Sequence, residues 1–200
     1  MKILGITGGV GSGKSRVLAY LEDTYGAVVC QADHIAWELQ MPDTDCYCEI
    51  VRRFGARILH PDKTIDRAKL GQLVFADAGL LEALNQIMHP AVKREVKKRM
   101  QVERQRGTRL FVLEAALLIE EDYGEICDEL WYIYTSEPVR RERLKTSRAY
   151  SDEKIDAIMA SQLSEERFRT ACHRVIENSG AFEETALQIR QSMMILEKDR

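Results

Sequence analysis

Residues 8–15 have the types and spacing that hold a chain of phosphates. They fit the pattern of a glycine, four free positions, a glycine, a lysine and a serine or threonine. Glycine lets the backbone fold tightly around an anion, so that successive N–H groups point at its oxygens. Lys14 would bridge the outer phosphates, and the Ser15 hydroxyl would ligate Mg²⁺. The residues expected to contact the nucleotide here are Gly9, Val10, Gly11, Ser12, Gly13, Lys14, Ser15 and Arg16.

The segments on either side of this loop give it the context that the motif requires. An apolar run at 3–7 predicts a strand before it, and Val17, Leu18, Leu21 and Tyr25 predict one face of a helix after it. A helix that begins at the loop turns the positive end of its dipole toward the anion. A glycine-rich turn without a ligand is the alternative. Because strand, spacing, Lys-Ser pair and helix coincide, we expect a nucleoside triphosphate as the ligand.

Short apolar runs alternate with longer helical patterns along the rest of the chain. Strands that are buried on both faces of a parallel sheet produce such nearly continuous runs. We therefore predict an α/β fold, a three-layer phosphate-loop (P-loop) NTPase with a five-stranded parallel sheet. The other four predicted strands are at 28–30, 110–113, 130–134 and 174–176.

The stretch at 33–108 shows no convincing strand and reads as several helices. A parallel crossover needs only about a dozen residues, so the surplus is expected to form a helical insertion that binds the substrate. The nucleotide-binding core then comprises 1–32, 109–136 and 172–200. The positions with helical apolar spacing in the insertion are Leu70, Leu73, Val74, Leu81, Leu84 and Ile87.

A second excursion, at 137–171, is expected to form a helical lid. Ser136 can cap its first helix, which is strongly basic, and Ser151 can cap the second, whose apolar face includes Leu163. A basic lid that closes over phosphates would suit a kinase. A solvated charged face is the alternative. For the basic run at 93–99 a solvated face is the expectation, and a role in substrate binding is the alternative. The basic residues of the first lid helix are Arg140, Arg141, Arg143, Lys145 and Arg148.

Composition narrows the classes of function. The net charge of −3 argues against a general nucleic-acid binder. No apolar run approaches the roughly 20 residues of a membrane span, and the chain enters a predicted strand directly, without a signal peptide. We expect a cytoplasmic protein with neither nucleic acid nor membrane as a partner. The cysteines lack a metal-site pattern, so we expect reduced thiols with structural or incidental roles.

Two carboxylates follow predicted strands and are candidates for catalysis. Asp33 lies just past the second strand, at the edge where open α/β sheets bind ligands. It could take the proton of an acceptor hydroxyl, or equally cap the next helix. Glu114 ends the third strand, where it could hold Mg²⁺ through water or be a plain strand-end carboxylate. Motifs that read guanine or mark transporter ATPases are missing from the sequence, so a small kinase fits best.

The order of further sequence pieces resembles the dephospho-coenzyme A kinase family nearly end to end. Residues 7–15 resemble its opening, and Ala32-Asp33 stands where that family has its acceptor-side aspartate. His89-Pro90 matches its His-Pro pair. The remaining matching pieces are Phe54-Gly55, Ile65-Asp66-Arg67, Leu70, Val74-Phe75, Leu84-Asn85, Leu117-Leu118, Glu120, Arg143-Leu144, Gln162, Val175-Ile176, Asn178 and Gly180.

The resemblance implies transfer of the γ-phosphate of ATP to the ribose 3′-hydroxyl of dephospho-coenzyme A, which gives ADP and coenzyme A. Asp33 would be the catalytic base, Lys14 a phosphate ligand and Arg143 a lid arginine over the transferring phosphoryl group. Asn178 and Gly180 would lie beside the adenine of ATP. The residues implied on the substrate side are Thr7, Asp33, His89 and Leu117.

The sequence departs from the family pattern at several positions. Arg16 replaces a threonine, Gln31 replaces the first aspartate of Asp-Ala-Asp, and Trp37 stands where an arginine is expected. Glu114 keeps the charge of a usual aspartate on a longer arm. A second lid arginine is replaced by Ser147.

Three questions stay open at this level. Either Arg143 or Arg148 could be the main lid arginine. A P-loop kinase for another small acceptor, such as a nucleoside or a shikimate-like metabolite, and a non-catalytic nucleotide-binding module are the alternative functions. A monomer or a weak homo-oligomer is expected.

Overall fold

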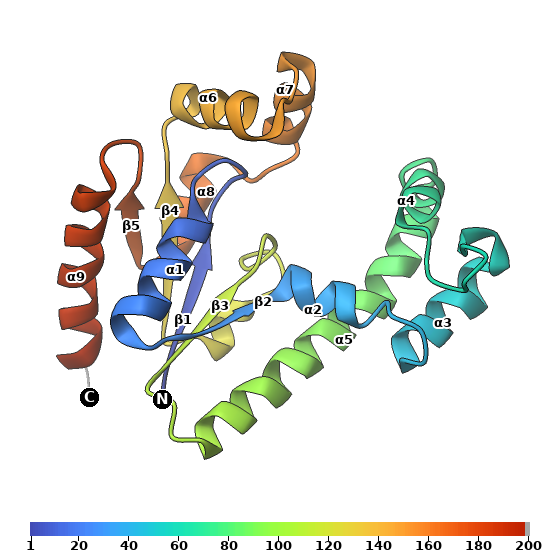
Figure 1. The fold of residues 1–200 in the computed structure, drawn as a ribbon, viewed down its shortest axis with the longest axis horizontal. Coiled ribbons are helices and arrows are strands. Elements are labelled where there is room, and N and C mark those ends of the chain that lie inside the picture. The colour runs from blue at the N-terminus through green and yellow to red at the C-terminus, as the bar shows by residue number, and fades with distance from the viewer. Residues whose placement is uncertain (199–200) are drawn as a thin grey trace. The chain divides into compact units, whose positions relative to one another are not determined.

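The computed structural model describes residues 1–198 (Figure 1). Its five strands form one sheet in the order β2-β3-β1-β4-β5. β1 pairs in parallel with β3 and with β4, and β4 pairs in parallel with β5. All five predicted strands are confirmed, each slightly longer than predicted. They are β1 (Lys2–Thr7), β2 (Val28–Gln31), β3 (Leu110–Glu114), β4 (Glu129–Tyr134) and β5 (Arg174–Glu177).

The chain divides into two compact units. One consists of Met1–Val29 and Arg106–Arg200, and the other of Cys30–Gln105. In the first unit, α1 (Lys14–Tyr25) and α9 (Phe182–Lys198) cover one face of the sheet (Figure 1). Each buried aliphatic or aromatic side chain there contributes about 1.5–3 kcal/mol. The core side chains on this face include Leu4, Ile6, Val17, Leu18, Leu21, Val112, Trp131, Ile133, Ile189, Met193 and Leu196.

The opposite face of the first unit meets η2 (Tyr123–Ile126) and α8 (Glu165–Ala171). Tyr132 on β4 stacks on Phe168 of α8, with ring centroids 4.7 Å apart and planes 8° apart. The prediction that Leu163 lies on the second lid helix is wrong. That helix, α7 (Asp152–Ala160), ends earlier, and Leu163 lies in the connection to α8. Ser164 explains the break, because its side chain caps α8 through the Arg167 N–H at 3.3 Å.

Of the two serines predicted to cap helices in residues 137–171, only Ser151 caps with its side chain. Ser151 caps α7 with its side chain, which accepts from the Lys154 N–H at 3.4 Å. Ser136 occupies the N-cap position of α6 (Glu137–Arg148), but its side chain makes no capping hydrogen bond. Its backbone N–H donates to the Ser179 Oγ at 2.9 Å, which ties the start of α6 to the loop after β5.

A partly buried ion pair joins β4 to β5 in the first unit. The Glu129 carboxylate accepts hydrogen bonds from Arg174 Nε at 2.8 Å and Nη2 at 3.0 Å, and from the Trp131 indole at 2.7 Å. Burial raises the pKa of Glu129, but these hydrogen bonds outweigh burial and hold the pKa below its usual value. The carboxylate therefore stays charged and satisfies the indole of a fully buried Trp131.

The second unit is built around the long helix α5 (Ala78–Gln105), which contacts the other three α-helices of the unit. These are α2 (Ala32–Glu38), α3 (Asp45–Phe54) and α4 (Arg67–Phe75), and η1 (Ala56–Ile58) follows α3. The prediction of several helices in this stretch is confirmed. Its buried apolar side chains include Ile35, Ile50, Phe54, Ile58, Leu70, Val74, Met88, Val92 and Val96.

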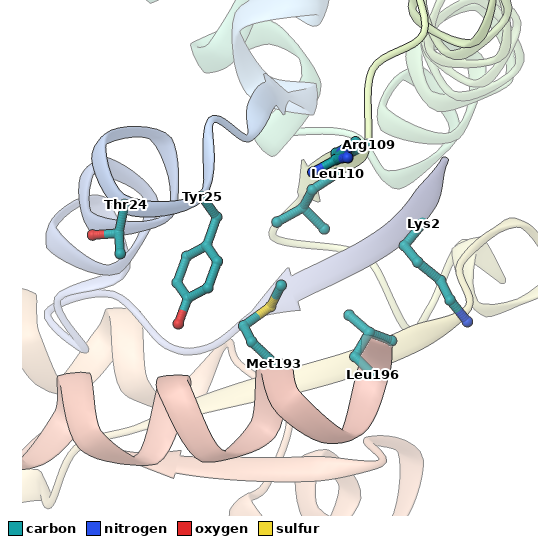
Figure 2. A pocket seen from close by; sticks show the side chains of 7 residues that line it. All are labelled: Lys2, Thr24, Tyr25, Arg109, Leu110, Met193 and Leu196. Carbon is teal, nitrogen blue, oxygen red and sulfur yellow. The ribbon is translucent and has the colours of Figure 1, made fainter. Parts of the chain in front are cut away.

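A cavity of about 290 Å³ opens at the edge of the sheet where β1 and β3 begin (Figure 2). Its lining side chains are Lys2, Thr24, Tyr25, Arg109, Leu110, Met193 and Leu196. The glycine loop follows the other end of β1, so this cavity is not part of the candidate site. Within residues 1–198, no helix is both long and apolar enough to cross a membrane.

Candidate active site

The loop between β1 and α1 has glycine where its backbone adopts positive φ angles and where neighbouring side chains lie close to it. Gly13 ends the loop with φ of +83°, a left-handed conformation that favours glycine. A Cβ on Gly13 would lie 2.5 Å from Asn178 Nδ2, and one on Gly9 would lie 2.4 Å from Arg140 Nη2. The side chains of Arg140 and Asn178 thus pack against the loop backbone. A loop of this shape can point its N–H groups at a bound anion.

Two hydroxyls at the loop are buried and lack a hydrogen-bond partner among the described residues. They are Thr7 Oγ1, at the end of β1, and Ser12 Oγ, inside the loop. A buried polar group without a partner costs about 1–3 kcal/mol, so such groups are uncommon and indicate a place where another molecule binds. Both hydroxyls belong to the segment in which the sequence predicts phosphate contacts. The donors present thus fit a nucleotide.

Lys14 and Glu114 come together at the carboxyl end of the sheet. Lys14 Nζ donates to the Gly8 carbonyl at 2.7 Å and lies 3.7 Å from Glu114 Oε1. Glu114 is the last residue of β3, in register with Ile6 of β1, so the strand pairing carries it to the loop. The side chain of Glu114 is 10% exposed. Ser15 stands in the first turn of α1 with its side chain exposed.

Arg143 lies on α6, which follows the carboxyl end of β4 (Figure 1), and its side chain contacts the loop. Its Nη2 donates to the Asn178 carbonyl at 2.8 Å, and its Nη1 lies 3.4 Å from the Ser12 carbonyl. Arg148 on the same helix is exposed, and its guanidinium carbon lies 5.9 Å from the centre of the Tyr150 ring. Of the two candidate lid arginines, Arg143 therefore is the one that contacts the loop.

Arg140 contacts the glycine loop, although no pattern in the sequence predicts an individual role for it. Its Nε donates to the Val10 carbonyl at 2.9 Å and its Nη2 to Gln162 Oε1 at 2.5 Å. Burial lowers the pKa of Arg140 below its ordinary value. The residue links the loop to α6 and to the connection after α7. In the sequence it was one member of a basic run, and nothing in that run distinguished it.

Asn178, the residue directly after β5, hydrogen-bonds to the glycine loop. Its Nδ2 donates to the Ser12 carbonyl at 2.7 Å, and its Oδ1 accepts from Thr185 Oγ1 at 3.1 Å. Both polar atoms of the side chain thus already have hydrogen-bond partners in the first unit, and contact of Asn178 with adenine stays a prediction.

Gly180 lies exposed in the turn before α9. The guanidinium of Arg16 lies over the Phe182 ring at 4.1 Å, a cation–π arrangement at the start of α9.

The remaining predicted residues divide between the two units. Leu117 follows β3 in the first unit and is 43% exposed, whereas its neighbour Leu118 is fully buried. Asp33 and His89 belong to the second unit, on α2 and α5. The expectation that Asp33 could cap α2 is wrong, because Gln31 occupies the N-cap position. Asp33 instead stands exposed in the first turn, where a carboxylate is favoured by the helix dipole.

Comparison with known proteins gives a consistent picture over nearly the whole chain. A family model described as dephospho-CoA kinase matches residues 2–184. The chain is 37% identical over 189 residues to the dephospho-CoA kinase of Symbiobacterium thermophilum, covering 94% of this chain and 79% of that protein. It is also 37% identical over 199 residues to the enzyme of the same name from Carboxydothermus hydrogenoformans, covering 99% and 94%.

Solved structures share the architecture. A crystal structure of a Thermus thermophilus protein matches with a TM-score of 0.83 at 28% identity, covering 98% of this chain and 97% of the other. A shikimate kinase from Acinetobacter baumannii, in complex with shikimate, matches with a TM-score of 0.56 at 17% identity, covering 100% and 95%. The second likeness shows the fold alone. The predicted α/β fold of a P-loop kinase is confirmed.

Proposed function

The chain belongs to the dephospho-CoA kinase family, and on that basis we propose that it transfers the γ-phosphoryl group of ATP to the ribose 3′-hydroxyl of dephospho-CoA. The products are CoA and ADP. The observation that carries this function is the family match over residues 2–184, joined to a glycine loop with Lys14 in place. The chemistry is phosphoryl transfer, in which positioning and charge stabilisation supply most of the catalysis.

ATP fits the loop on the evidence of its own residues. The unpartnered hydroxyls of Thr7 and Ser12 are side-chain donors for phosphate oxygens. The glycines of the loop adopt positive φ angles that let its backbone N–H groups turn toward the same anion. Lys14 now donates to a loop carbonyl, and we propose that its ammonium turns to the phosphates when ATP is present. Arg143 holds its positive charge beside the loop, where it would offset charge on the transferring group.

Mg²⁺ belongs to the proposal as the ion that would neutralise the phosphates. The part of the chain that the structure describes contains no cluster of three or more His, Cys, Asp or Glu side chains that could hold a metal ion. Mg²⁺ is commonly held by one or two protein groups together with substrate phosphates and water. The Ser15 hydroxyl and the Glu114 carboxylate, beside Lys14, are the groups proposed for this role.

Asp33 is the proposed catalytic base. It is an exposed carboxylate in the first turn of α2, directly after β2, and its side chain is not used as a helix cap. A carboxylate with that freedom can accept the proton of the acceptor hydroxyl as the phosphoryl group transfers. We further propose His89 and Leu117 as contacts of the acceptor, and the region around α6 and α7 as the lid. The proposal includes the cytoplasm as the place of reaction and a monomer or weak homo-oligomer.

The direct test is mass spectrometry of dephospho-CoA after incubation with Mg-ATP and the protein. The expected product carries one added phosphoryl group, which ³¹P NMR then locates on the 3′-oxygen. Lys14→Ala should abolish the product. Asp33→Asn should reduce kcat sharply and leave ATP affinity nearly unchanged, and a parental rate for this variant would refute the base assignment.

The alternatives give different results in the same experiment. A kinase for another acceptor would release ADP only with that acceptor, so a panel that includes nucleosides and shikimate separates it. A nucleotide-binding module would bind ATP and show no acceptor-stimulated turnover. Absence of any mass gain on dephospho-CoA would refute the proposed reaction.

A further inference from the structure

An exposed aromatic pair stands on α2 in the second unit. Trp37 is 44% exposed, and its ring lies 5.7 Å from the ring of His34 with the planes 23° apart. The other tryptophan of the chain, Trp131, is fully buried. Single exposed apolar side chains are common, but an exposed indole with a flat face and a stacked partner offers a surface for another ring.

Polar contacts hold in place the helix that carries this aromatic pair. His34 Nδ1 lies 3.1 Å from Glu38 Oε1, one turn along α2. Glu38 also accepts a hydrogen bond from Arg99 of α5, and Arg99 Nε donates to Glu95 at 3.1 Å. Arg99 is thus an exception within the basic run that was expected to form a solvated face. The network anchors α2 on α5, so that the rings are presented by a fixed helix.

The position of Trp37 relative to Asp33 indicates which ring the exposed indole could contact. The two residues are four apart on α2, so they share a helix face with Cβ atoms about 5–6 Å apart. In dephospho-CoA the reacting 3′-hydroxyl and the adenine are carried by the same ribose. A carboxylate that takes the hydroxyl proton and a ring that stacks on the base must therefore lie close together.

We propose that Trp37, backed by His34, stacks on the adenine of the acceptor nucleotide and so orients its ribose toward Asp33. This inference rests on the proposed function, which supplies the identity of the acceptor. Stacking of a base on an aromatic side chain contributes about 1–3 kcal/mol, which corresponds to roughly 5-fold to 150-fold in affinity. Trp37 then determines specificity for an acceptor that carries a purine.

Steady-state kinetics test the proposal. Trp37→Leu should raise KM for dephospho-CoA about 10-fold, from the stacking range above, and leave KM for ATP unchanged. Trp37→Phe keeps an aromatic face and should recover most of the affinity. Phe75→Leu is the matched control, because Phe75 is an exposed aromatic residue of the same unit (83% exposed) on a different helix. It should have the parental KM.

Intrinsic fluorescence gives a readout that does not depend on turnover. Dephospho-CoA should quench the exposed Trp37, and 4′-phosphopantetheine, which lacks the base, should not. The buried Trp131 provides the constant background, which Trp37→Phe isolates.

The outcomes separate the two proposals. Parental KM for dephospho-CoA in Trp37→Leu, equal quenching by 4′-phosphopantetheine, or a rise in KM for ATP instead would each overturn the stacking role. Quenching by dephospho-CoA without any turnover would refute the proposed reaction and support the stacking. Turnover without quenching would do the reverse.

Discussion

Replacement of Arg140 by methionine tests whether α6 holds the phosphate loop in shape. Methionine keeps much of the length of the side chain and removes both hydrogen bonds, to the Val10 carbonyl at 2.9 Å and to Gln162 at 2.5 Å. The substitution also removes a partly buried cation, whose pKa is lowered by burial. Because the methionine variant no longer pays the desolvation cost of that cation, part of the free energy lost with the hydrogen bonds is offset. Arg140 contacts the loop from outside and is not assigned to the transferring phosphoryl group.

The magnitude follows from these contacts. A hydrogen bond from a charged donor contributes about 1.5–3 kcal/mol, and with two such bonds minus the cost of burying the guanidinium we expect a net loss of about 2 kcal/mol. In a chain of this size that loss lowers Tm by about 6 °C. If the loop must be reordered each time ATP binds, the same free energy limits the rise in KM for ATP to about 30-fold. We expect about 10-fold, with a much smaller change in kcat.

The assay is a thermal melt of each variant together with kinetics at saturating dephospho-CoA. Arg148→Met is the matched control, since Arg148 lies on the same helix, is exposed and stands beside Tyr150 rather than the loop. Its free energy of unfolding should change by less than about 0.5 kcal/mol. Gln162→Ala removes one of the two partners of Arg140 and should fall between the two variants.

Two results would refute this reasoning. If Arg140→Met matches Arg148→Met in both Tm and KM for ATP, the contacts with the loop carry no free energy. If kcat instead falls by orders of magnitude with KM for ATP unchanged, Arg140 acts on the transition state and our assignment of it as a positioning residue is wrong.

Two further predictions concern charge and thiols in the fold. The folded pKa of Glu129 lies below its ordinary value of 4.5, because hydrogen bonds, chiefly from Arg174, outweigh burial. The unfolded chain therefore binds more protons in this range, so the contribution of Glu129 is complete above pH 4.5 and is lost as the pH falls toward the folded pKa. Denaturant titrations should show the difference in free energy of unfolding between the parent and Glu129→Gln shrinking from pH 7 to acid pH, and a constant difference would contradict the assignment. Iodoacetamide should label the exposed Cys48 first, since burial raises the pKa of Cys127 and of Cys172 to about 12. Cys48→Ser should remove the fast phase, and persistence of that phase would show that another thiol is accessible.

The strands and the glycine loop could be predicted because their signals are local. A run such as 110–113 is apolar at every position, since both faces of a parallel strand are buried. The loop carries its positive φ angles in its own glycines, as at Gly13. The meeting of Glu114 with Lys14 could be anticipated too, because parallel pairing brings strand ends to one edge of the sheet.

Capping was less predictable. Gln31 and Asp33 both lie at the start of α2. Aspartate is a preferred N-cap residue and glutamine is not, so residue type favours Asp33 as the cap. The strand continues to Gln31, however, so the helix begins one residue before Asp33 and leaves its carboxylate exposed. The extra helix α8 had its own signal in Ser164 followed by two glutamates, which the apolar spacing around Leu163 obscured.

The sequence by itself predicted a phosphate-binding loop at the end of a strand in a parallel sheet, because the signals for backbone conformation and burial lie in neighbouring residues. It also determined the family, through the order of many short pieces. Only the tertiary structure showed which arginine of α6 donates a hydrogen bond to which backbone carbonyl. Arg140 and Val10 are 130 positions apart, and Asn178 and Ser12 are 166 apart. Partners at such separations depend on how the strands are ordered in the sheet, and no local pattern carries that information.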